Sequence, residues 1–352
     1  MSLIYIDGFE HSDIQRYDTL QGCDFIAGRN GNGLRVINGG GNKVRKQVPA
    51  ADEHATFIVG RAFNKSGGGA GDSSCWVGGG GDWGNMFAFL SDDGATCHVS
   101  VQRASGNQII VTRGAMNGTV LGSYIVTPIT YTDWYYFECK VVLHDSAGSV
   151  QVKMNGITII NLTGIDTKNG GTKTVFDSIG IGPSQTLNNV HDVVDDLYLC
   201  NGAGSVNNDF LGDVAVETLY PNGDGSSSQF LGSDGNSVNN YLLVDEPNTP
   251  ILTDYVEDSV SGHRDLYAMA NLVRTAGPVY GVQVTDHVRN SDAGAISCKT
   301  SLKSGATVES GPTFPVTTTW KTTRKMSELN PDGSVAWTIA AVNAIEAGVE
   351  VV

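Results

Sequence analysis

The stretch Val150-Gln-Val-Lys-Met-Asn155-Gly156-Ile-Thr-Ile-Ile160 carries the strongest local signal of fold in this chain. Apolar and polar residues alternate before Asn155, and a run of β-branched residues follows Gly156. Asn-Gly favours a two-residue hairpin turn, because both turn positions need a positive φ that these residues tolerate. The stretch therefore predicts two antiparallel strands joined by a tight turn, and Asn117-Gly118 predicts a second turn of this kind.

Short segments with period-two hydrophobicity recur along the chain, and helical periodicity is almost absent. They are rich in β-branched and aromatic residues, which is typical of strands. About a dozen short strands with Gly-rich turns and no intervening helices predict an all-β fold, a sandwich or jelly roll of two antiparallel sheets. The clearest predicted strands are Thr56–Phe63, Met86–Leu90, His98–Gln102, Gln108–Thr112, Tyr135–Leu143 and Val193–Cys200.

The length of 352 residues predicts two domains, at roughly 100–200 residues per domain. Cys200-Asn-Gly-Ala-Gly-Ser205 follows the last predicted strand of the sandwich, so we place the first domain at 1–201 and a smaller β-rich domain at 206–352.

One short helix is expected near the end of the second domain. Thr338 is its expected N-cap, Ile339 to Ala347 its body and Gly348 the C′ residue that closes it. Val349–Val352 would then be a short terminal strand or tail.

The formal net charge is −15, with 22 Lys and Arg against 37 Asp and Glu. A nucleic-acid partner would require a basic face, and an anionic membrane is disfavoured for the same reason. No stretch of about 18 apolar residues occurs, and the N-terminal segment lacks the basic region of a signal peptide. We therefore expect a chain that folds in the cytoplasm, does not insert into membranes, and keeps its six cysteines as buried thiols.

Most catalytic motifs are missing from the sequence. Gly79-Gly80-Gly81-Asp82-Trp83-Gly84 fits Gly-x-Gly-x-x-Gly, but no helix follows to hold a phosphate, so we interpret it as a loop. A glycosidase of this fold would need two carboxylates on one strand face. Glu138 stands alone on its strand, and Asp195 and Asp196 are expected on opposite faces. The sequence therefore predicts no enzymatic activity.

Metal binding is a more open question. Asn222-Gly-Asp224-Gly-Ser226 resembles the start of a calcium loop, but Ser233 stands where the bidentate Glu of an EF-hand is needed. A better acidic group follows from sequence proximity, and calcium is the cation that it would bind. The alternative is a solvated turn with strand-end carboxylates that cap backbone N–H groups. The residues of this group are Asp192, Asp195, Asp196, Asp209 and Asp213.

The acidic group lies within a longer stretch without basic residues. Between Lys173 and Arg264 there is no Lys or Arg, while 14 Asp and Glu occur. Such a stretch is expected to serve an interface or a cation, or else to be a solvated acidic face.

The longest expected loop of the sandwich runs from Ser66 to Gly84. It sets Trp76, Asp82 and Trp83 among glycines. Loops at the end of a rigid sandwich are common binding sites. These three residues are therefore candidates for packing against another subunit or for binding a glycan, and a purely local cluster of the two rings is the third alternative.

Several segments also carry a family resemblance. The first set is similar to a concanavalin/laminin-G-like jelly roll: Tyr5-Ile-Asp-Gly-Phe9, Trp134 to Asp145 with Gly148 to Gly156, and Asp195-Asp196-Leu-Tyr198. The second set resembles structural proteins of tailed-bacteriophage particles: Asn208 to Gly225 and Trp337 to Gly348. Together the two sets cover nearly the whole chain.

The resemblance implies a virion component, made in the host cytoplasm and displayed on the particle surface. It would be a capsid decoration protein or a protein attached to the tail or baseplate. It would act through contacts with other virion proteins and with copies of itself. The alternative is a glycan-binding receptor-recognition module of a tail fibre or tail tip. The chain has no heptad stretch or collagen-like repeat, which favours a compact attached protein over a fibre shaft.

Overall fold

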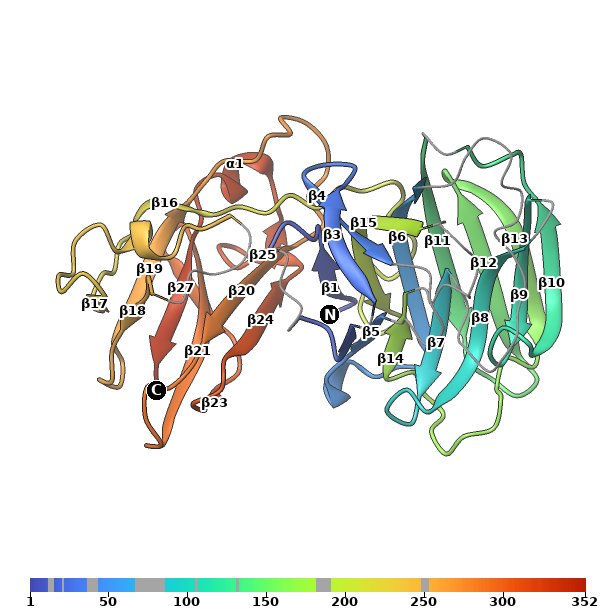
Figure 1. The fold of residues 1–352 in the computed structure, drawn as a ribbon, viewed down its shortest axis with the longest axis horizontal. Coiled ribbons are helices and arrows are strands. Elements are labelled where there is room, and N and C mark those ends of the chain that lie inside the picture. The colour runs from blue at the N-terminus through green and yellow to red at the C-terminus, as the bar shows by residue number, and fades with distance from the viewer. Residues whose placement is uncertain are drawn as a thin grey trace. The chain divides into compact units, whose positions relative to one another are not determined.

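The fold comes from a computed structural model (Figure 1). It describes residues 1–11, 16–20, 22–36, 44–66, 86–104, 107–130, 133–181, 191–247 and 253–352, with the backbone alone at 65, 66, 191 and 192. The contacts divide the chain into two compact units, Met1–Val216 and Glu217–Val352, which are treated separately below.

Unit 1 contains two antiparallel sheets. Sheet A has eight strands: β1 (Leu3–Asp7), β3 (Cys23–Ala27), β4 (Asn32–Val36), β6 (Thr56–Ser66), β11 (Trp134–Val142), β12 (Gly148–Met154), β13 (Ile157–Ile165) and β15 (His191–Asn201). Sheet B has seven: β2 (Thr19–Leu20), β5 (Val44–Gln47), β7 (Phe87–Ser91), β8 (Thr96–Ala104), β9 (Gln108–Arg113), β10 (Thr119–Ile125) and β14 (Ser178–Gly180). A short 3-10 helix, η2 (Ala50–Asp52), precedes β6.

The two sheets enclose one hydrophobic core. Alternate residues of β6, β11 and β15 contribute Phe57, Phe137 and Leu197 from sheet A, and β7 and β8 contribute Phe89 and Val99 from sheet B, all of them fully buried. Burial of an aromatic or aliphatic side chain of this size stabilises a fold by about 1.5–3 kcal/mol. The predicted β-sandwich is confirmed, and all six of the clearest predicted strands are present.

The two predicted Asn-Gly turns differ. Asn155 and Gly156 have φ of 49° and 78° and join β12 to β13, as predicted. Neither Asn117 nor Gly118 has a positive φ, so the prediction of a second such turn was wrong. Between β9 and β10 the chain makes a longer loop, and Gly114, with φ of 92°, is its left-handed residue.

Unit 2 is also β-rich. Its main sheet has six strands: β16 (Pro221–Asp224), β19 (Arg264–Met269), β21 (Ile296–Ser304), β22 (Thr307–Ser310), β23 (Phe314–Val316) and β27 (Glu346–Val351). Three strand pairs complete it: β17 (Leu231–Gly232) with β18 (Val256–Glu257), β20 (Val282–Val288) with β24 (Lys321–Ser327), and β25 (Leu329–Asn330) with β26 (Val335–Ala336). A 3-10 helix, η4 (Asn240–Leu243), and one short α-helix, α1 (Ile339–Val342), are the described helices of this unit.

The C-terminal helix is shorter than predicted. Thr338 is its N-cap, and the Thr338 hydroxyl accepts a hydrogen bond from the Ala341 backbone N–H at 3.1 Å. The prediction that the helix continues to Ala347 and closes at Gly348 was wrong. Gly348 lies in β27, where a Cβ would overlap the Asp265 carbonyl oxygen of the neighbouring strand β19. The glycine therefore serves close strand packing and not a helix end.

The unit boundary lies at Val216, beyond the Gly-rich stretch 202–205 where the sequence places it. Residues 202–216 belong to unit 1, because they pack on sheet A. The described cysteines Cys23, Cys97, Cys139, Cys200 and Cys298 are free thiols, and Cys75 lies outside the described residues. None of the described helices has the length and hydropathy of a membrane span.

Candidate functional site

The segment 207–216, here called the strap, crosses the outer face of sheet A. The face is identified by alternation: Phe137 of β11 points into the core, so Tyr136 and Glu138 point outward. Glu138 is nevertheless only 1% exposed. The strap covers this face, and it binds the outward side chains through its own backbone N–H groups.

Glu138 is the central anchor of the strap. Its Oε1 accepts a hydrogen bond from the Tyr198 hydroxyl at 2.6 Å and one from the Gly212 backbone N–H at 2.8 Å. The Leu211 N–H donates to the same Tyr198 hydroxyl at 3.2 Å. Gly60 of β6 leaves the room that the Tyr198 ring needs, because a Cβ there would overlap the ring. Glu138 is thus a structural carboxylate that joins sheet A to the strap.

Asp195 and Asp196 form the second anchor, and both are fully buried. The pairing of β15 with β6 is irregular at this point, and Asp196 has a φ of 51°. Strict alternation predicts opposite faces for these two side chains. The bulge instead directs both carboxylates to the turn at Arg29 and Asn30, so that prediction was wrong.

Each carboxylate has a distinct task at this turn. Asp195 accepts backbone N–H groups of Arg29 at 2.6 Å, Asn30 at 3.1 Å and Asp196 at 2.7 Å. Asp196 accepts the Val216 N–H of the strap at 2.7 Å. Burial, and then the adjacent Asp196 charge, raise the pKa of Asp195 to about 7.

Arg29 connects the second anchor to the strap. Its Nη1 lies 3.3 Å from Asp196 Oδ2, 2.7 Å from Asp213 Oδ1 and 3.3 Å from the Val214 carbonyl oxygen. Tyr136 completes the group, because its hydroxyl donates to the Asp196 carbonyl oxygen at 3.0 Å. One guanidinium group thus neutralises two of the carboxylates that the sequence analysis assigned to calcium.

The described carboxylates do not fit a calcium site. Asp196 and Asp213 are bound to Arg29, and Asp209 pairs with Lys140 at 3.1 Å on the exposed side of the strap. Within the described ranges, no group of three or more His, Cys, Asp or Glu side chains is arranged to hold a metal ion. The side chain of Asp192 lies outside the described part, so calcium binding through it stays a prediction. Asp224 caps the backbone N–H of Asn239 at 2.8 Å, which is a turn contact.

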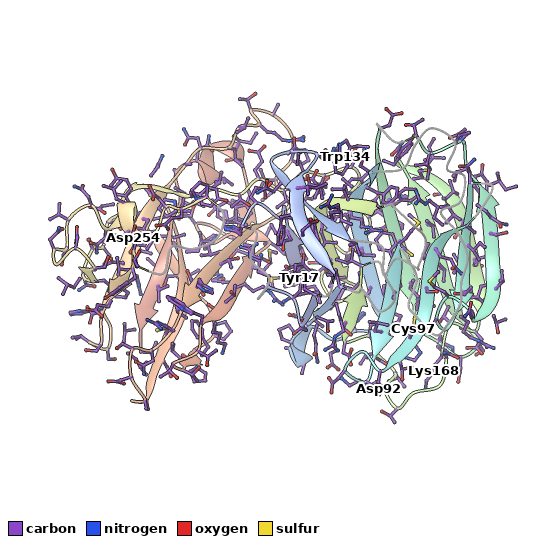
Figure 2. The ribbon with its side chains drawn as sticks, viewed as in Figure 1. Tyr17, Asp92, Cys97, Trp134, Lys168 and Asp254 are labelled. Atoms are coloured by element: carbon purple, nitrogen blue, oxygen red, sulfur yellow. The ribbon has the colours of Figure 1, made fainter. Side chains whose placement is uncertain are left out.

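Ser91, His98 and Asp92 form a second polar group, at the turn between β7 and β8, in which Ser91 and His98 are fully buried and Asp92 is half-buried. Asp92 is labelled in Figure 2, at the lower edge of unit 1. His98 Nε2 lies 2.8 Å from Ser91 Oγ, and Ser91 Oγ lies 3.2 Å from Asp92 Oδ2. The residue types match those of a hydrolase triad, so the direction of the hydrogen bonds decides what the group does.

That direction is opposite to the one catalysis needs. The Asn169 backbone N–H donates to His98 Nδ1 at 3.0 Å, and burial lowers the pKa of His98. The neutral ring therefore carries its proton on Nε2 and donates it to Ser91, which in turn donates to Asp92. A general base must accept the serine proton, and His98 has no free nitrogen with which to do so.

The loop candidates Trp76, Asp82 and Trp83 lie outside the described residues, so their role stays a prediction. Sequence reasoning also missed three members of the strap network, Arg29, Tyr136 and Tyr198. The signal available was the glycine at position 60 within a strong strand pattern, because a glycine inside a strand often marks a place where another group approaches closely.

Comparisons with known proteins give limited information. No protein-family model and no curated protein matches the sequence. Among solved structures, the binding domain of Paraclostridial Mosquitocidal Protein 1 is 11% identical, with a TM-score of 0.40 over 57% of this chain and 49% of that chain. An alginate lyase is 13% identical, with a TM-score of 0.33 over 47% and 80%. Domain 4 of an arabinanase from Geobacillus stearothermophilus, in complex with arabinotriose, is 15% identical, with a TM-score of 0.33 over 56% and 92%. Values this low assign no activity to the present chain.

Proposed function

We propose that this chain is a non-enzymatic structural protein displayed on the surface of a tailed-phage particle, as a capsid decoration or a tail- or baseplate-attached protein. The proposal rests on one observation: the segments that carry the family resemblances contact one another in the fold. Glu138 of the β11 segment, Asp196 and Tyr198 of the β15 segment, and Gly212 and Asp213 of the phage-like segment form one hydrogen-bonded network, in which Asp213 is half exposed. The first two of these segments resemble a jelly roll and the third resembles virion proteins, and residues from all three build one scaffold.

The hydrogen bonding of the polar groups supports a non-enzymatic role. The carboxylates of the network accept backbone N–H groups or an arginine, and each is buried or paired. In the Ser91–His98–Asp92 group, His98 donates its proton to Ser91 and Ser91 donates to Asp92, which is a structural arrangement. A protein built in this way offers rigid surfaces to partners, which is the requirement of an assembled particle.

The test is to locate the chain. Antibodies raised against the purified chain should label phage particles from the host that carries its gene, in immunogold electron microscopy. Labelling of the head would assign a decoration protein, and labelling of the tail or baseplate would assign an attached protein. Particles that carry no label, while the chain is detected in the same lysate, would contradict the proposal.

The receptor-module alternative has its own measurement. Binding of the full chain to a glycan array should be lost in a Trp76→Ala, Trp83→Ala double variant if this loop holds a sugar. A Trp320→Ala variant is the control, since Trp320 lies in unit 2. Binding that the loop variant abolishes and the control retains would favour the alternative.

A further inference from the structure

Strands β10 and β13 are the terminal strands of sheets B and A, and they lie next to each other at one side of unit 1 (Figure 1). A Cβ on Gly122 of β10 would lie 3.1 Å from Leu162 Cδ1 of β13. The two strands therefore form one continuous surface, here called the β10–β13 edge. An edge strand presents unpaired backbone N–H and C=O groups, to which another strand can add.

This edge lacks the protection that the other edges have. The sequences of β10 and β13, TVLGSYI and ITIINLTGI, contain no charged residue and no proline. Natural edge strands usually carry Lys, other charges or Pro, because these block the addition of another strand. Every other described edge strand longer than two residues carries such a residue: Asp7 in β1, Asp24 in β3, Pro221 and Asp224 in β16, Asp286 in β20, Glu309 in β22, Pro315 in β23 and Lys321 in β24.

Large apolar side chains are exposed on the same edge. Ile125 is 71% exposed, Ile157 70%, Val120 60% and Tyr124 47%. Single exposed apolar residues are common on proteins and need no explanation. Four of them are concentrated on two neighbouring, uncharged edge strands, and such a concentration points to an interaction surface.

Charge selects the occupant of this surface. The chain carries a net charge of −15, so two copies repel one another wherever their charged faces meet. A foreign partner recruited by charge would bring a basic patch to the acidic faces of this chain, and the uncharged edge offers such a patch nothing to complement. A second copy instead needs a contact with no like charges in it. The β10–β13 edge is such a contact.

We propose that two copies of this chain associate through their β10–β13 edges. The two β10 strands pair in an antiparallel manner about a two-fold axis, which extends sheet B from one copy into the other, and Ile157 of β13 packs beside them. A two-fold contact of this kind is isologous, so the same patch serves both copies. The inference deepens the proposed assembly role, because it names the partner of one surface.

Sedimentation velocity of the full chain, over about 1 to 100 µM, tests the proposal in the range of ordinary homodimer affinities. The wild-type chain is expected to shift from monomer to dimer with concentration. The triple variant Val120→Lys, Ile125→Lys, Ile157→Lys should weaken the association about a hundredfold or more, because it brings like charges face to face across the contact. All three positions are exposed, so the variant should keep its fold, which circular dichroism checks.

The matched control is Val238→Lys, Val273→Lys, Val335→Lys in unit 2, where the three valines are 66%, 87% and 55% exposed. It adds the same three positive charges and should associate as the wild type does. Hydrogen exchange gives a second readout, since the amides of β10 should gain protection only at concentrations where the dimer forms.

A wild-type chain that stays monomeric throughout, or a triple variant that dimerises as the wild type does, would overturn this inference. The particle-labelling experiment is independent of it. A dimer without labelled particles would contradict the virion role and leave the edge contact standing, whereas labelled particles with a monomeric chain would do the reverse.

Discussion

The strap-covered face of sheet A and the β10–β13 edge show two opposite uses of sheet surface within unit 1. The strap-covered face is rich in charged and hydroxyl groups, and those that sheet A contributes are buried and hydrogen-bonded: Tyr136, Glu138, Asp195, Asp196 and Tyr198. The edge is uncharged and apolar, and it is open to solvent. Polarity is therefore a poor guide to exposure in this molecule. The polar residues that attract notice in the sequence stabilise the unit, and the plain residues of two edge strands are the ones available to a partner.

The largest effect is expected from Asp196→Asn. The variant deprives Arg29 and the Val216 N–H of their anionic partner, and it should lower the free energy of unfolding of unit 1 by about 3 kcal/mol. Asp209→Asn is the control, since this exposed carboxylate binds Lys140 and the Phe210 backbone N–H on the surface, and its cost should stay within about 0.5 kcal/mol.

Calorimetry with calcium and with a chelator measures both variants. If Asp196→Asn and Asp209→Asn lower the free energy of unfolding equally, the buried Asp196 contributes no more to stability than the surface carboxylate does. A melting temperature that calcium raises in the wild type but not in Asp196→Asn would restore the calcium site that the sequence suggested.

The second effect is a pH dependence carried by Asp195. Its pKa in the folded state is about 7, above the ordinary value for an aspartate, so the folded state binds the proton more tightly than the unfolded state does. Stability should therefore rise as pH falls below about 7, by about 2 kcal/mol at pH 5.

Asp195→Asn should abolish this slope in the unfolding transition of unit 1, whatever its absolute stability. Burial also raises the pKa of Asp286 in unit 2 to about 7, so Asp286→Asn serves as the control that changes only the transition of unit 2. A slope that survives in Asp195→Asn would assign the pH response to another group.

A smaller effect is expected from Tyr198→Phe, which removes one hydroxyl from the strap network. Glu138 loses a donor and the Leu211 N–H loses an acceptor, at a cost of about 1–2 kcal/mol. Tyr124→Phe on the exposed edge should cost almost nothing. Urea unfolding compares the two variants, and equal values would show that the Glu138 anchor contributes no more than a surface hydroxyl.

The smallest effect is expected from Ile157→Thr at the edge. At concentrations where the chain is monomeric, this change should alter the free energy of unfolding by less than about 0.5 kcal/mol, because the side chain is already in water. A loss of several kcal/mol would mean that the edge is a buried part of the monomer, and it would break the comparison drawn above.

Local patterns predict the strands of this fold well, because period-two burial leaves a direct trace in the sequence. Phe57, Val59 and Phe63 lie even numbers of positions apart in β6, and these three do point into the core. The Asn155-Gly156 turn was predictable for the same reason, since its geometry depends on two adjacent residues.

The candidate site was less predictable, because its contacts join distant parts of the chain. Arg29 meets Asp213 across a separation of 184 residues, and no local pattern encodes that distance. The bulge at Asp196 also made the predicted side-chain directions wrong, because the alternation of faces along a strand assumes a regular strand. The predicted length of the terminal helix was wrong for a third reason. The pairing of β27 with two strands outweighs the helical preference of residues 343–347.

The position of β27 in unit 2 bears on how the chain is made. This strand lies between β19 and β21 in the main sheet, yet it follows both of them in the sequence. During synthesis, β19 and β21 emerge from the ribosome without the strand that joins them, and vectorial folding of unit 2 must wait for β27. Unit 1 is complete well before that moment. A nascent chain interrupted after Ile345 should therefore present a folded first unit and an unfolded second one to the proteases of the cell.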